Sequence, residues 1–166
     1  MILSMAKTLI EKLDNMGFAP EQPLRMRKLL SVSERRAKYM LSFSPEMDSC
    51  TFKIDGNIIK DMTSDKCDYV ILASYNNAWA EVFVELKGSD ISHAINQLKQ
   101  TISNSIFKDT QHSLRWARIV TPGRIPSNAG NSIVERAKVD FKKKKCEFRI
   151  NKSMQRETLK DSDILK

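Results

Sequence analysis

Paired cysteines and long apolar runs are both missing from this chain of 166 residues. The three cysteines lie far apart and show no C-x-x-C spacing, which argues against a zinc site or a disulfide framework and favours a reducing cytoplasm. No apolar run approaches the roughly 20 residues needed to cross a bilayer, and the first residues lack the apolar core of a signal peptide. We therefore expect a cytoplasmic protein with no membrane partner, and we find no internal repeat.

Acidic residues are outnumbered, because 28 Lys and Arg stand against 20 Asp and Glu and give a net charge of +8. A basic balance favours polyanionic partners, with nucleic acid first among them. The length suits one domain with a real core, and the 41% hydrophobic content is that of an ordinary globular protein. Charge alone leaves an alternative open, since many basic proteins bind no nucleic acid.

Two short apolar runs, residues 69–73 and 82–86, have the length and the β-branched and aromatic content of buried strands. The residues between them are polar, and the pair Asn76-Asn77 tolerates the left-handed backbone of a tight turn. These features predict a β-hairpin.

Charged residues stand at one end of this predicted hairpin. Strand alternation places Glu85 and Lys87 on the same face at the end of the second strand, and Asp68 directly precedes the first strand. A hairpin of this length can bring the Asp68 carboxylate back towards Glu85. Two carboxylates beside an ammonium group suit a Mg²⁺ site.

The same residues resemble the signature of the restriction-endonuclease-like superfamily, P-D…(D/E)-x-K. Asp68 is followed by sixteen residues, then by Glu85-Leu86-Lys87 and a predicted helix, while Cys67 takes the proline position. The resemblance implies that Asp68 and Glu85 bind Mg²⁺ or Mn²⁺, and that the Leu86 carbonyl is a further ligand. It also implies that Lys87 orients or activates the attacking water and that Gln97, on the following helix, belongs to the catalytic site.

Other carboxylates stay open as metal ligands. Asp61 and Asp65 are alternatives to Asp68, which we prefer because it directly adjoins an apolar run. Superfamily members often carry an acidic residue on a helix before the sheet, and Glu34 is the candidate here. The spacing does not separate Glu34 from two other glutamates, Glu11 and Glu21.

The remaining patterns predict the order of the other elements. Helices are expected at 4–16, 24–41, from an N-cap at Ser89 to 106, and at 132–145; loops at 42–49 and 122–131; a hairpin of strands 50–54 and 57–60 around Asp55-Gly56; and strands at 114–120 and 146–150. The predicted fold class is α/β (α+β), with the αβββαβ core of the superfamily and a central mixed sheet flanked by helices. We expect a single nuclease-like domain at 1–152, with N-terminal helices at 1–47 and the core at 48–152, followed by a polar tail at 153–166.

Resemblance and charge together predict a metal-dependent nuclease that acts on DNA in preference to RNA, cuts internally, and belongs to a defence or mobile-element setting. Basic residues near the sheet are expected to hold the phosphates: Lys142, Lys143, Lys144, Lys145, Arg115, Arg118 and Arg124. The alternative is a nucleic-acid-binding or accessory subunit with the same fold and no chemistry, because a Glu-x-Lys at a strand end is often only a surface ion pair. A homodimer or a partner protein also stays open, since many superfamily members act as dimers.

Overall fold

The computed structural model describes residues 7–60, 66–86, 90–123 and 131–166. No helix in these ranges is long and apolar enough to cross a membrane. The elements are, in chain order, α1 (Leu9–Asn15), β1 (Gln22–Glu34), β2 (Ala37–Lys53), β3 (Tyr69–Tyr75), β4 (Ala78–Leu86), α2 (Ile91–Ser103), α3 (Ser105–Lys108), β5 (Leu114–Thr121), α4 (Asn131–Lys143), β6 (Glu147–Lys152), β7 (Arg156–Lys160) and α5 (Asp161–Ile164).

The described strands form one mixed sheet in which β1 to β6 lie side by side in chain order, while β7 pairs with β2. Neighbours are antiparallel from β1 to β4, and the pairs β4–β5 and β5–β6 are parallel. A parallel pair needs a crossover connection. Here α2 with α3 supplies the first crossover and α4 the second. The predicted mixed sheet flanked by helices is thus confirmed.

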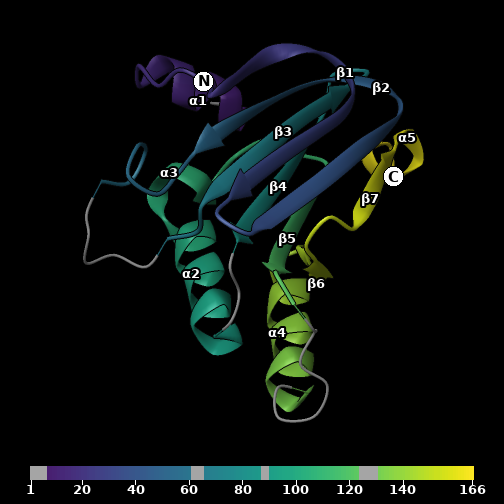
Figure 1. Ribbon diagram of the computed structural model, residues 1–166. Helices are drawn as coiled ribbons and strands as arrows, with labels where there is room; N and C mark the ends of the chain where they lie inside the picture. The colour runs from purple at the N-terminus through teal and green to yellow at the C-terminus, as the bar shows by residue number, and fades with distance from the viewer. Residues whose placement is uncertain (1–6, 61–65, 87–89, 124–130) are drawn as a thin grey trace.

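One face of the sheet, called the helix face below, is covered by α1, α2 and α4 (Figure 1). The apolar stripe of α2 is buried as its three- and four-residue spacing predicts. Phe83 lies under the helices with no exposed surface and meets the Phe107 ring edge-on, with 5.6 Å between ring centroids. Since alternate residues of a strand share a face, Glu81 and Glu85 also face the helices.

The opposite face, called the hairpin face, is covered by the β1–β2 hairpin, which arches across the sheet together with β7 and α5 (Figure 1). Every second residue at the start of β2 is buried against the central strands: Ala37, Tyr39, Leu41 and Phe43. β7 runs parallel to this part of β2 and buries Leu159 completely. The sheet therefore has a packed core on both faces.

The predicted helix at 24–41 and the loop at 42–49 are wrong, because these residues form β1 and β2. The buried positions of β2 recur every second residue, which is the strand period, although spacings of three and four can also be found in the same stretch. The hairpin reverses at Arg35-Arg36, which carries neither the Asn nor the Gly of a common hairpin turn. Pro45 lies where the β1–β2 register shifts, a position at which strands tolerate proline.

The predicted strand at 57–60 is wrong as well, and the polar tail expected at 153–166 contains the strand β7 in addition to the short helix α5. Gly56, with a φ of 81°, sits in a turn that is closed by a single bridge between Asp55 and Ile59, and residues 50–53 are the end of β2. The tail contributes β7 and α5 to the hairpin face. Its strand partner is the segment 40–44 of β2, which was predicted as the end of a helix and the start of a loop. No strand partner for β7 was therefore expected from the sequence.

The predictions around the β3–β4 hairpin are confirmed. Asn76 and Asn77 have φ values of 50° and 63°, the left-handed conformation that a two-residue hairpin turn requires. The helices and strands predicted after Lys87 are also found, as α2, β5, α4 and β6. The cap of α2 is Asp90, whose Oδ1 accepts the His93 N–H at 3.1 Å, while the predicted cap at Ser89 lies outside the described residues.

Candidate functional site

The β3–β4 hairpin brings Asp68 and Glu85 together, as the sequence predicts. Tyr69 pairs with Val84, so the residue before Tyr69 lies beside the residue after Val84. The Asp68 N–H donates to the Val84 carbonyl at 3.1 Å, which extends the ladder by one bond beyond β3. Asp68 is 5% exposed and Glu85 is 7% exposed. Two acidic side chains are thus nearly buried at the end of the sheet.

Hydrogen bonds fix the Asp68 carboxyl in place. Its backbone carbonyl accepts the Ile54 N–H at 2.8 Å, and its Oδ2 accepts the Leu86 N–H at 2.8 Å. The second bond reaches across the hairpin to the residue that follows Glu85. Leu86, predicted to offer its carbonyl to a metal, therefore contributes its N–H to the orientation of Asp68, while its side chain packs in the core of the hairpin face.

Glu34 joins these two residues, and Asp68, Glu85 and Glu34 are called the acidic site below. The Asp68 carboxyl lies within hydrogen-bonding range of both the Glu85 and the Glu34 carboxyls. Burial raises the pKa of Asp68 to about 6, and the charge of Glu34 adds to this rise, while the Leu86 N–H and Glu85 act against it. Glu34 ends β1, so the acid expected from a helix comes from a strand of the hairpin face.

The helix α2 holds the chain that leads into Asp68. Gln97 Nε2 donates to the Lys66 carbonyl at 3.0 Å, and Thr101 Oγ1 accepts the Cys67 N–H at 2.8 Å while donating to the Gln97 carbonyl at 2.8 Å. These bonds satisfy backbone groups that are buried beside the site. Gln97, predicted to be catalytic, therefore holds the backbone two residues before Asp68.

Lys66 is a feature that sequence analysis missed. Its side chain is only 8% exposed, and its Nζ lies 3.8 Å from Asp55 Oδ1. A lysine this deeply buried is uncommon unless it is paired. The ion pair ties the turn after β2 to the residues just before Asp68. Nothing in the sequence separates Lys66 from nearby lysines such as Lys60, since burial here depends on contacts between distant elements.

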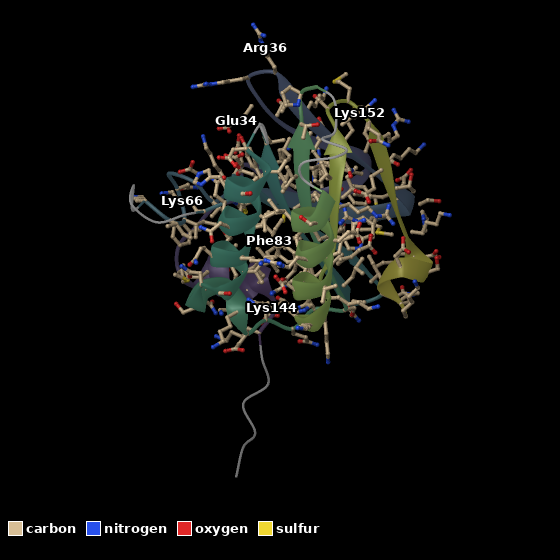
Figure 2. The ribbon with its side chains drawn as sticks, turned by 90° about the horizontal axis from the view of Figure 1, so that it is seen from below. Glu34, Arg36, Lys66, Phe83, Lys144 and Lys152 are labelled. Carbon is tan, nitrogen blue, oxygen red and sulfur yellow. The ribbon has the colours of Figure 1, made fainter. Side chains whose placement is uncertain are left out.

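The predicted phosphate-binding lysines lie far from the acidic site. Lys87 and Arg124 fall outside the described residues. Lys142–Lys145, called the lysine run below, are all exposed, and Lys144 Nζ donates to Ser103 Oγ at 2.9 Å. Ser103 is the last residue of α2, whereas the first turn of α2 is the part that follows β4, so about 20 Å of helix separates the two ends. Figure 2 likewise shows Lys144 at the opposite end of the molecule from Glu34.

A groove on the surface of the molecule is also separate from the acidic site. It has a volume of about 780 Å³ and lies between α4 and β6, with Lys138, Lys142 and Lys145 among its lining residues. None of the three residues of the acidic site lines it. Part of the lysine run therefore belongs to this groove.

The prediction that Arg115 and Arg118 hold phosphates is wrong, because both guanidinium groups are buried in ion pairs. Arg115 is 4% exposed and binds Glu81 on the helix face, with 2.6 Å between Nη2 and Oε1. Arg118 has no exposed surface and binds Glu157 of β7, with 2.8 Å between Nε and Oε1. Each carries a charge that is already neutralised inside the fold.

The donor set at the acidic site fits a hard divalent cation. Within the ranges that the structure describes, no three His, Cys, Asp or Glu side chains form a group that could hold a metal by themselves. Mg²⁺ does not require such a group, because it keeps several waters and is commonly bound through one or two carboxylates. Asp68 and Glu85 supply two carboxylates side by side, one of them held rigidly by the Leu86 N–H. We therefore take these two residues as the protein ligands that a Mg²⁺ ion would use.

Comparison with known proteins leaves the site to be interpreted from its own geometry. No family model, curated protein or solved structure matches this chain.

Proposed function

We propose that this protein is a divalent-metal-dependent nuclease that hydrolyses phosphodiester bonds in DNA, and that its catalytic centre is the acidic site. The observation that carries the proposal is the convergence of Asp68 and Glu85 at the end of the β3–β4 hairpin, directly before Lys87 in the sequence. The succession of α1, the antiparallel strands β2, β3 and β4, then α2 and β5 supports it, because this is the αβββαβ order of the restriction-endonuclease-like superfamily. The strand β1 precedes that order as an addition on the edge.

The residues at and around the acidic site have distinct parts in the proposed reaction. A bound Mg²⁺ or Mn²⁺ supplies a lowered pKa for the attacking water and positive charge for the phosphate oxygens. Asp68 and Glu85 would hold the ion, and the Leu86 N–H orients the Asp68 carboxyl by a hydrogen bond to its Oδ2. Gln97 and Thr101 keep the chain before Asp68 in place. Lys87 is the residue that the signature assigns to the attacking water, and its ammonium group stabilises negative charge on the phosphate.

A second candidate is a nucleic-acid-binding or accessory subunit that keeps the fold without chemistry. The observation in its favour is that the described residues hold no three-residue metal group. The two candidates differ in their response to substitution at Glu85. In a nuclease Glu85→Gln abolishes cleavage, whereas in a binding subunit it leaves nucleic-acid binding nearly intact.

The test is cleavage of supercoiled plasmid, circular single-stranded DNA and RNA in Mg²⁺ or Mn²⁺, with EDTA as a blank. The variants are Glu85→Gln and Asp68→Asn, which remove one charge each and keep the side-chain size. Glu135→Gln is the matched control, because Glu135 is an exposed glutamate of α4 with only a surface ion pair to Lys138. Calorimetric titration of the metal into each protein gives a readout that does not depend on turnover.

We expect the wild type and Glu135→Gln to open circular DNA and to bind the metal, and both site variants to do neither. Opening of circular substrates also establishes internal cutting. Cleavage that survives in both site variants, or metal binding that is equal in all four proteins, would contradict the proposal.

A further inference from the structure

Four basic side chains lie at the same end of the sheet as the acidic site. Arg35 and Arg36 form the turn between β1 and β2, directly after Glu34, and Lys38 follows in β2. Lys152 ends β6, where it pairs with Thr121 of β5. Figure 2 shows Arg36, Lys152 and Glu34 toward the same end of the molecule. These four residues are called the basic rim.

The basic rim is held by hydrogen bonds between segments that are distant in the sequence. Ser153 Oγ donates to the Arg36 carbonyl at 3.3 Å and accepts the Lys38 N–H at 2.8 Å. The Met154 N–H donates to the Lys38 carbonyl at 2.9 Å, and the Ser153 N–H donates to the Thr121 carbonyl at 2.8 Å. The hairpin turn, the β6–β7 turn and the end of β5 are thus bonded into one unit.

This unit adjoins the acidic site through two connections. Glu34 immediately precedes Arg35, and its carboxyl reaches Asp68. Thr121 follows Val120, which pairs with Leu86, so Lys152 and Glu85 belong to the same end of the parallel strands. The basic rim is therefore anchored to the same strand ends that carry the carboxyls.

The charges of the basic rim are available to a ligand. Arg35, Arg36 and Lys152 are exposed and Lys38 is half-buried. Among the ion pairs between described residues, none involves these four side chains. In contrast, Arg115 and Arg118 are neutralised inside the fold. A polyanion that approaches the carboxyls of the acidic site is repelled by them, so fixed positive charges beside them lower the barrier to its approach.

We infer that the basic rim is the surface that holds the sugar–phosphate backbone of DNA at the acidic site, and that the lysine run at the far end of α2 does not. This inference rests on the proposed function for its choice of ligand, although it concerns binding and not cleavage. It replaces the phosphate contacts expected from the sequence with residues that the fold places at the same end of the sheet as Asp68. The arginine pair of the hairpin turn is the central element, because guanidinium groups match phosphate geometry.

The test measures binding in the Glu85→Gln background with EDTA present, so that cleavage cannot interfere. Fluorescence anisotropy follows a labelled DNA duplex, and a single strand of the same length, over about 50 to 200 mM salt. The rim variant is Arg36→Gln with Lys152→Gln, and the competing variant is Lys142→Gln with Lys143→Gln. A third variant, Lys108→Gln with Arg136→Gln, carries the same loss of two charges at exposed positions outside both clusters.

We expect the rim variant to bind DNA about tenfold more weakly than the parent. The slope of log affinity against log salt concentration should become shallower by about two, since each phosphate contact contributes about 0.9 to that slope. The competing variant and the third variant should stay within about twofold of the parent. Equal losses in the rim and competing variants, or a loss confined to the competing variant, would overturn the inference.

The inference and the proposed function fail in different ways. If the wild type cuts no DNA or RNA but the rim variant alone loses affinity, the basic rim is a nucleic-acid surface and the nuclease proposal falls. If the wild type cuts DNA and the rim variant binds as tightly as the parent, the nuclease proposal stands and the inference is wrong.

Discussion

Replacement of Asp68 by asparagine should stabilise the protein while it removes the proposed nuclease activity. Asp68 is almost fully buried beside Glu34 and Glu85, and burial raises its pKa from 3.8 to about 6. The asparagine amide keeps an oxygen that can accept the Leu86 N–H. Its NH₂ group can also donate hydrogen bonds to the neighbouring carboxyls. The charge that is disfavoured in the folded protein is thereby lost, and the local hydrogen bonds are retained.

The size and the pH dependence of this effect follow from the same pKa. The difference between 3.8 and about 6 corresponds to about 3 kcal/mol of folding free energy. Because the folded pKa is raised, the folded protein binds more protons than the unfolded chain between these two values. The free energy of unfolding is therefore not reduced by Asp68 below about pH 4, and it falls as the pH rises to about 6. Above that, Asp68→Asn should be more stable than the wild type by about 1–3 kcal/mol.

Urea denaturation in EDTA, followed by tryptophan fluorescence, checks this at about pH 4 and about pH 7.5. The exposed substitution Glu135→Gln should change the free energy of unfolding by less than about 0.5 kcal/mol at both values. Adding Mg²⁺ should raise the stability of the wild type and leave Asp68→Asn unchanged, since only the folded wild type binds the ion. The reasoning is refuted if Asp68→Asn is less stable than the wild type at the higher pH, or if the difference between them does not depend on pH.

Three further predictions concern other parts of the fold. Glu157→Gln should lower the free energy of unfolding by about 3 kcal/mol in a urea titration, because it leaves the fully buried Arg118 without its main partner. Burial alone would raise the pKa of Glu157, but Arg118 lowers it below 4.5. In the wild type the stabilisation by this ion pair should therefore persist above about pH 4.5 and disappear as the pH falls through the lowered pKa. Thr101→Val should cost about 1–3 kcal/mol in thermal melts by removing the acceptor of the buried Cys67 N–H, and Thr101→Ser should restore most of it. Asn77→Gly should leave stability unchanged or raise it by up to about 1 kcal/mol, whereas Asn77→Val should lower it, because Asn77 has a φ of 63°.

The parts of the fold that could be predicted from the sequence are those whose signals are local. The Asn76-Asn77 turn, the apolar strands on either side of it and the apolar stripe of α2 each appear within about a dozen residues. The β1–β2 hairpin does not have this property. Its turn is Arg35-Arg36, its register shifts twice, and its buried positions face a sheet that is contributed by later residues. These long-range contacts stabilise the hairpin, although the same residues also show a helical spacing of apolar positions.

The acidic site shows the same division. Asp68 and Glu85 could be predicted to meet because one hairpin of known register connects them. Glu34 was one of three equivalent glutamates in the sequence, and only the arch of β1 across the sheet distinguishes it from Glu11 and Glu21. Lys66 gave no signal at all, since its burial comes from packing between elements. Spacing therefore predicts pairs within one hairpin, while residues added from other layers need the tertiary structure.

Because three layers contribute to the acidic site, its geometry depends on the packing of both faces of the sheet. Asp68 extends the sheet, Thr101 accepts the N–H of the preceding Cys67 from the helix face, and Glu34 reaches Asp68 from the hairpin face. The turn that follows Glu34 is bonded to Ser153, which leads into β7, and β7 is held in turn by the pair of Glu157 with Arg118. Loss of that ion pair would loosen β7 and then the turn beside Glu34. A buried arginine would thereby act on a carboxyl of the acidic site through the hairpin turn that β7 helps to hold.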